Sequence, residues 1–110
     1  MRRVAAHWLY LPDGRRIHYP VVEIEGDSVV NYYPLEDELP VTEWLGGIMI
    51  LSPLAQLSIS PEGTFEDILK KLHPEKKITY PLYCWYVNNI DLETKSFISR
   101  RQVTLVKTED

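Results

Sequence analysis

A chain of 110 residues has the size of one ordinary domain and is too short for two, so residues 1–110 are expected to form a single domain. Hydrophobic residues make up 45% of the chain and charged residues 25%, a balance that supports a buried core and excludes intrinsic disorder. The formal net charge of −4 provides no overall positive field for a phosphate backbone, so we expect no nucleic acid among the partners.

The first third of the chain is rich in β-forming residues and turn signals. Residues 4–11 are β-like, and Pro12-Asp13-Gly14 behind them predicts a turn, because proline presets φ and glycine accepts a positive φ. Residues 17–25 alternate between apolar and acidic side chains toward their end, which is typical of a strand with one buried face. Gly26-Asp27 then separates this run from a second β-rich run at residues 29–33 and predicts a hairpin.

The middle of the chain combines an acidic loop with an apolar strand. Residues 34–40 hold three acidic residues between two prolines, so an exposed loop is expected there. Gly46-Gly47 interrupts the next β-like segment, and glycines inside a strand often mark a bulge or a close backbone approach. The apolar run at residues 48–51 that follows predicts a strand covered on both faces.

One helix is predicted, at residues 64–72. Its apolar side chains recur at helical spacing along one stripe: Phe65, Ile68, Leu69 and Leu72. Thr64 is placed to cap the start, acidic residues occupy the first turn, lysines occupy the last, and Pro74 prevents continuation.

Two further strands are predicted at residues 78–87 and 98–106, joined in a long hairpin. The first is the most aromatic stretch of the chain and ends at Asn88-Asn89, and the second alternates between apolar and polar side chains. Strands dominate the whole prediction. We therefore expect a mainly β fold, a small β-sandwich or partly open barrel, with one short α-helix that covers an open end or edge.

The histidines form no recognisable metal motif. His7, His18 and His73 have no second histidine, cysteine or paired carboxylate at a metal-ligand spacing nearby. A site assembled from distant segments stays open, with His7 and His18 on neighbouring strands as the candidate pair. The more ordinary interpretation is that they are surface or half-buried residues without a function.

No other catalytic centre is apparent. Cys84 lies in an aromatic run with no base in sequence reach, which favours a core thiol over a nucleophile. The chain has neither a G-x-S-x-G elbow nor the glycine spacing of a phosphate-binding loop. The acidic residues Glu36, Asp37 and Glu38 are more simply a solvated loop than paired catalytic carboxylates. We therefore expect no catalytic residues, no cofactor and no metal.

Two groups of side chains are candidate contact surfaces. Three arginine pairs, at residues 2–3, 15–16 and 100–101, could form a basic patch for an anionic partner, although neighbours on a strand point to opposite faces. The large aromatic residues could stack on a sugar or a base, but in so small a domain they favour core packing or self-association. The residues proposed for an interface are Trp44, Tyr83, Trp85 and Tyr86.

Location is inferred from the same composition. The longest apolar run is much shorter than the roughly 18 residues of a membrane span, so no membrane association is expected. The basic residues 1–3 are not followed by a long apolar stretch with a small-residue cleavage site. Cys84 is the single cysteine and excludes an intramolecular disulfide, which agrees with a reducing compartment. We expect a cytoplasmic protein.

Residues 4–52 carry a series of motifs: Ala5-Ala6-His7-Trp8-Leu9-Tyr10, Pro12-Asp13-Gly14, the alternating β residues around Gly26-Asp27, and residues 43–51. This series resembles the N-terminal β composite domain of the amidohydrolase superfamily, the metallo-dependent hydrolases. In that family an apolar strand leads toward an H-x-H metal motif, whereas Ser52-Pro53-Leu54 follows here. The hairpin at residues 83–105 resembles short bacterial proteins that carry this opening without a barrel. The resemblance implies a β-sandwich-like domain and transfers no catalytic residue.

The sequence thus predicts a non-catalytic binding or scaffold domain that associates with itself, most simply as a homodimer. One alternative is a small-molecule binder or an accessory subunit related to amidohydrolases. The other is an enzyme with a site assembled from His7 or His18 beside a carboxylate of the acidic loop.

Overall fold

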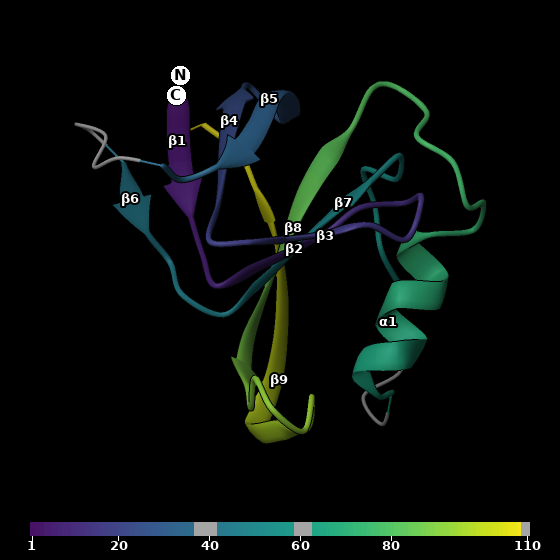
Figure 1. The fold of residues 1–110 in the computed structure, drawn as a ribbon. Helices are drawn as coiled ribbons and strands as arrows, with labels where there is room; N and C mark the ends of the chain where they lie inside the picture. Colours follow the sequence, from purple (N-terminus) through teal and green to yellow (C-terminus); the bar gives the residue numbers. More distant parts are fainter. Residues whose placement is uncertain (37–41, 59–62, 109–110) are drawn as a thin grey trace.

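The computed structural model describes residues 1–36, 42–58 and 63–108, which form nine strands and one helix (Figure 1). In chain order the elements are β1 (Arg2–Ala5), β2 (Trp8–Tyr10), β3 (Arg16–His18), β4 (Pro20–Glu25), β5 (Ser28–Pro34), β6 (Glu43–Trp44), β7 (Ile48–Ser52), α1 (Phe65–Leu72), β8 (Tyr83–Ile90) and β9 (Phe97–Val106). The dominance of strands confirms the predicted mainly β fold class.

The strands form two sheets. Sheet A has the order β5-β4-β1-β6, and sheet B has the order β3-β2-β7-β8-β9. The pairs β1 with β6 and β2 with β7 are parallel, and the other neighbouring pairs are antiparallel. Within the described residues the sheets do not close into a barrel, and the arrangement is sandwich-like, as predicted.

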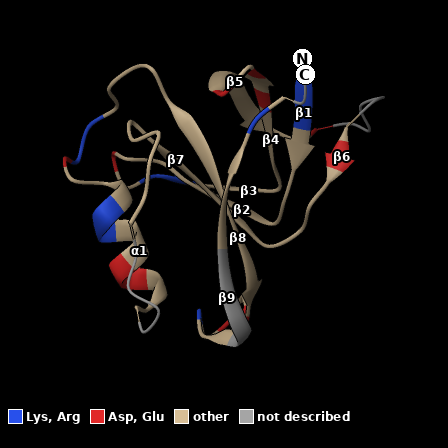
Figure 2. Ribbon diagram, turned by 180° about the vertical axis from the view of Figure 1, so that it is seen from behind, with Lys and Arg blue, Asp and Glu red and all other residues tan. Residues whose placement is uncertain are grey.

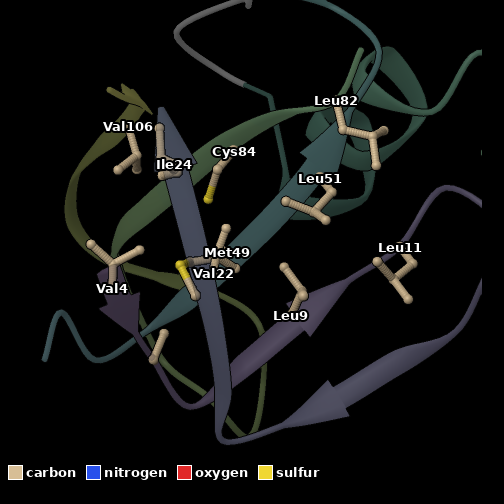
Figure 3. Packing of buried hydrophobic residues seen from close by; sticks show 11 residues of the cluster. Val4, Leu9, Leu11, Val22, Ile24, Met49, Leu51, Leu82, Cys84 and Val106 are labelled. Carbon is tan, nitrogen blue, oxygen red and sulfur yellow. The ribbon is translucent and has the colours of Figure 1, made fainter. Parts of the chain in front are cut away.

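A first hydrophobic core fills the space between the two sheets (Figure 3). Both sheets contribute buried side chains to it, including Val4, Val22 and Ile24 from sheet A and Leu9, Met49, Leu51 and Cys84 from sheet B. Cys84 is completely buried among them, which confirms its predicted place in the core.

A second core lies on the other face of sheet B, where α1 packs. Phe65, Ile68 and Leu72 of the helix are buried there together with Ile48 and Ile50 of β7. Since the alternate residues of β7 belong to the first core, this strand is covered on both faces, as its apolar run predicted.

The helix begins and ends where the sequence predicted. Thr64 Oγ1 accepts a hydrogen bond from the Asp67 N–H, and the Asp67 carboxylate accepts one from the Thr64 N–H (2.9 Å), which completes a capping box. Figure 2 shows acidic residues at one end of α1 and lysines at the other. Both placements oppose the helix dipole.

Three segments of the chain pass directly from one sheet to the other: β1 into β2, β3 into β4, and β6 into β7 (Figure 1). The breaks between these strands, at residues 6–7, 19 and 45–47, are neighbours in space, and we call them together the bend. The Tyr19 N–H donates to the His7 carbonyl (2.8 Å), and the His7 N–H donates to the Gly47 carbonyl (3.0 Å). These bonds hold the two sheets together at one side.

The predictions missed this bend. Residues 4–11 and 17–25 were each expected to be one strand, but each is divided where the chain crosses between the sheets. The close approach predicted at the glycine pair is present, since a Cβ at Gly47 would lie 3.0 Å from the Val87 carbonyl oxygen. The strand expected from residue 78 begins only at Tyr83.

Glu36 of the predicted acidic loop is exposed, whereas Asp37 and Glu38 lie outside the described residues. Among the described helices, none has the length and hydrophobicity that crossing a membrane requires.

Candidate functional site

The four residues proposed for an interface lie in different environments. Trp44, on edge strand β6, is 53% exposed. Trp85 is only 7% exposed, and its Nε1–H donates to the Leu54 carbonyl (2.9 Å). Tyr86 is half-buried and donates its hydroxyl proton to the Leu45 carbonyl, and Tyr83 is half-buried as well. Trp44 is therefore the member of this set that offers a large ring to a partner.

The histidines His7 and His18 are brought into one cluster, through Tyr19. The rings of His18 and Tyr19 are stacked with centroids 4.0 Å apart, and the His7 ring lies 6.1 Å from that of Tyr19. His7 is fixed by the bend itself, because its Nδ1 accepts a hydrogen bond from the Gly47 N–H (2.9 Å). His73 lies elsewhere, at the end of α1, where its Nε2 contacts the Leu51 carbonyl oxygen at 2.7 Å.

A continuous row of rings runs along the outside of the bend. The Arg16 guanidinium lies over Trp8 at 5.4 Å from the ring centroid, and Trp8 stacks on His18 at 4.4 Å. His18 in turn stacks on Tyr19. We call this row, together with the two residues beyond it, the aromatic ridge: Arg16, Trp8, His18, Tyr19, His7 and Trp44.

The far end of the ridge has two open rings. The Tyr19 and Trp44 centroids are 6.2 Å apart at an angle of 38°, and His7 packs edge-on against Trp44 at 5.0 Å. Tyr19 is 46% exposed, nearly as much as Trp44. Two large aromatic residues are thus held in place by their neighbours while about half of each stays exposed to solvent.

The backbone of Tyr19 explains how this row forms. Consecutive strand residues normally point to opposite faces, yet the rings of His18 and Tyr19 stack on one another. Tyr19 achieves this because its φ is +52°, a left-handed conformation that is rare for a bulky side chain. Its carbonyl accepts a hydrogen bond from the Leu35 N–H (2.8 Å), and its N–H is bonded to His7, so both sides of the residue are held.

The ridge faces away from the first core. None of its residues belongs to the first core among the described residues, and Trp8 packs against the second core on the opposite face of sheet B. Tryptophan, tyrosine and arginine on an exposed surface are the residue types that dominate protein contacts. The composition of the ridge therefore favours a macromolecular partner.

The arginine pairs do not form a basic patch among the described residues. Arg2 forms a two-point ion pair with Glu43, and Arg15 is bonded to Asp13. Arg3 donates to Glu23, which holds the pKa of that carboxyl below its usual value. Arg16 lies over the rings of Trp8 and Tyr10, and the side chains of residues 100–101 are outside the description.

Two catalytic alternatives find no geometric support in the described residues. Burial raises the pKa of the Cys84 thiol to about 12, so the nucleophilic thiolate is not formed near neutral pH. Across residues 1–36, 42–58 and 63–108, no three histidine, cysteine or carboxylate side chains lie close enough to share a metal ion.

The sequence did not reveal Tyr19 and Trp8 as members of a site, and it placed Arg16 in a candidate basic patch, not against aromatic rings. Pro20 follows Tyr19, and a residue before proline is expected to be extended, so the usual rule points away from a left-handed conformation. Sequence comparison does not assign the site either: this chain has no match among protein-family models, curated proteins or solved structures.

Proposed function

We propose that this chain is a non-catalytic binding module that associates with itself through the aromatic ridge. The observation that carries the proposal is the pair of open rings, Tyr19 and Trp44, held on the outside of the bend at 6.2 Å from each other. Their neighbours already restrict these rings, so little side-chain entropy is lost when a partner covers them.

The proposal is supported by the contrast between the ridge and the aromatic residues of the second core. Trp85 and Phe65 are buried in the second core, where they stabilise the packing of α1. The left-handed backbone conformation of Tyr19 costs about 1–3 kcal/mol of folding free energy, and nearly half of the residue surface stays exposed to water. Strain of this kind is found most often at functional sites.

The resemblance of residues 4–52 to the amidohydrolase composite domain also supports the proposal of a non-catalytic role. In that family the domain accompanies a catalytic barrel. The likeness transfers no catalytic residue to this chain, which agrees with a role in contact and assembly.

The test is to remove one open ring and compare the mass in solution by sedimentation equilibrium. Trp44→Ser is expected to weaken self-association by at least roughly tenfold. Truncating a tryptophan that is a hot spot of an interface costs about 2 kcal/mol or more of binding free energy. Its thermal unfolding should hardly change, since the ring is more than half exposed.

Tyr80→Ser is the matched control. Tyr80 is 70% exposed but belongs to no ring contact of the ridge among the described residues, so its removal should leave the association unchanged. A wild-type chain that stays monomeric at high micromolar concentration would contradict the proposal, as would equal effects of the two substitutions.

A second candidate is a small molecule with a flat apolar face, such as a sugar ring, which could lie across Tyr19 and Trp44. The open arrangement of these two rings favours it. Binding would raise the unfolding temperature in proportion to the logarithm of ligand concentration. A panel of simple sugars that leaves both the unfolding temperature and the Trp44 fluorescence unchanged would exclude this candidate.

A further inference from the structure

We propose that two copies of the chain meet ridge to ridge in an antiparallel, two-fold arrangement, in which Arg16 of each copy lies against Glu36 of the other. This inference rests on the proposed self-association and adds to it the orientation of the partner. The observations behind it are the charges at the two ends of the ridge.

Arg16 marks the first end. It is exposed, and its guanidinium lies over the rings of Trp8 and Tyr10, at 5.4 and 5.8 Å from their centroids. Arg2, Arg3 and Arg15 each form an ion pair with a carboxylate, whereas Arg16 forms none with the described residues. The rings fix its position while its charge stays available to an acidic group.

Glu36 marks the other end. It follows Leu35, whose N–H donates to the Tyr19 carbonyl (2.8 Å), so this part of the chain is attached to the Tyr19 end of the ridge. Glu36 is exposed and has no ion pair within the described ranges. A series of contacts thus joins the two charges through Tyr19: Arg16 lies over Trp8, Trp8 stacks on His18, His18 stacks on Tyr19, and Tyr19 is bonded to the residue before Glu36. Among the described ion pairs, Arg16 and Glu36 do not pair with each other in one copy.

A two-fold axis between two copies makes the charges of Arg16 and Glu36 complementary. It exchanges the ends of the ridge between two copies, so each Arg16 meets the other copy's Glu36 and the rings near Tyr19 meet across the centre. The same contact occurs twice, and the assembly closes as a dimer instead of growing into a filament.

Other occupants would use these charges differently. An acidic peptide would need Arg16 but not Glu36, and a neutral sugar would need neither. Only a second copy of the chain makes both residues necessary and makes a defect in one of them reparable by the opposite defect in the other.

The experiment uses two charge reversals, Arg16→Glu and Glu36→Arg, each studied alone and in an equimolar mixture by sedimentation velocity. Each variant alone creates two like-charge contacts in its dimer, which should raise the dissociation constant by roughly tenfold. In the mixture both contacts join opposite charges again, so a mixed dimer should form with close to wild-type affinity.

The controls are Lys76→Glu and Glu93→Arg, which change the net charge by the same amounts at exposed positions outside the ridge. They correct for general repulsion between charged copies. Unfolding temperatures of all variants should stay near that of the wild type, because none of these side chains is buried.

The outcomes separate this inference from the proposed function. Weakening by each ridge variant alone, recovery in the mixture and no effect of the controls would support the antiparallel arrangement. A wild-type dimer that Trp44→Ser weakens, but that the charge reversals do not affect or that does not recover in the mixture, would overturn the arrangement alone. A monomeric wild-type chain would overturn both.

Discussion

Tyr19 shows how one backbone angle can create a surface. With an extended backbone its ring would point away from that of His18, and the ridge would end there. With a φ of +52° the ring stacks on His18 and lies beside Trp44. This backbone conformation is less favourable in free energy than an extended one, and the hydrogen bonds to His7 and Leu35 hold it in place.

This strain predicts an unusual order of stability for two substitutions. Tyr19→Ala and Tyr19→Gly both remove the ring, but only glycine relieves the left-handed conformation. We expect Tyr19→Gly to be more stable than Tyr19→Ala by about 1 kcal/mol in urea unfolding, the reverse of the usual order in strands. Equal stability, or a more stable alanine variant, would show that the φ angle of Tyr19 is not strained. Both variants should lose self-association.

His73 predicts a dependence of stability on pH. Burial is the main cause that lowers the pKa of this imidazole below 6.5, and the Leu51 carbonyl and the charge of Asp13 oppose the shift only in part. Between the lowered folded value and 6.5 the unfolded chain binds more protons than the folded chain. The free energy of unfolding therefore decreases as the pH falls through this range.

The comparison variant is His73→Gln, whose amide nitrogen can still donate to the Leu51 carbonyl but does not titrate. The stability difference between wild type and variant, measured by urea unfolding, should become less favourable to the wild type from about pH 8 to about pH 5. A difference that is constant with pH would mean that His73 has the same pKa in both states.

Among the elements, local signals predicted more than long-range ones. Helix α1 was predictable because its cap, its charges and its apolar stripe all lie within ten residues of sequence. Strand β7 was predictable because an apolar run needs cover on both faces. The division of residues 4–11 and 17–25 was not, since their β composition continues through the bend and periodicity does not report a change of sheet.

The candidate site was predicted only in part, for a similar reason. Trp44 and Trp85 both lie in β-like segments, and alternation does not show which face the helix covers. Trp85 is buried in the second core, to which α1 contributes, whereas Trp44 lies on the edge strand β6. This difference arises from the tertiary arrangement. Stacking between the rings of His18 and Tyr19 depends on the positive φ angle of Tyr19, which no sequence pattern predicted.

The glycine pair gives a test of the bend as an element. Gly47 and Gly26 have nearly the same positive φ, 63° and 64°, but a Cβ at Gly26 would meet nothing within 4 Å. Gly26→Ala should therefore cost only the conformational penalty, about 1 kcal/mol. Gly47→Ala adds a 3.0 Å contact with the Val87 carbonyl oxygen and should cost at least roughly twice as much. Equal losses in urea unfolding would mean that the bend is not closely packed at Gly47.

At the scale of the whole molecule, the two cores occupy most of the apolar side chains and leave few large ones in contact with water. Two of these, Tyr19 and Trp44, lie together on the ridge. A standard protein interface covers about 800 Å² on each partner, which is a small part of the 6710 Å² surface of this chain. The ridge with its charged ends provides the centre of such an interface, and the residues around it would form the rim.

The most direct test of the ridge as the contact surface is to follow the indole N–H signals of the three tryptophans by NMR while the protein is diluted. We expect the signal of Trp44 to shift as the dimer dissociates, and that of Trp85, which is buried and bonded to the Leu54 carbonyl, to stay in place. A Trp44 signal that does not change across a range where the mass changes, or a mass that never changes, would contradict the account.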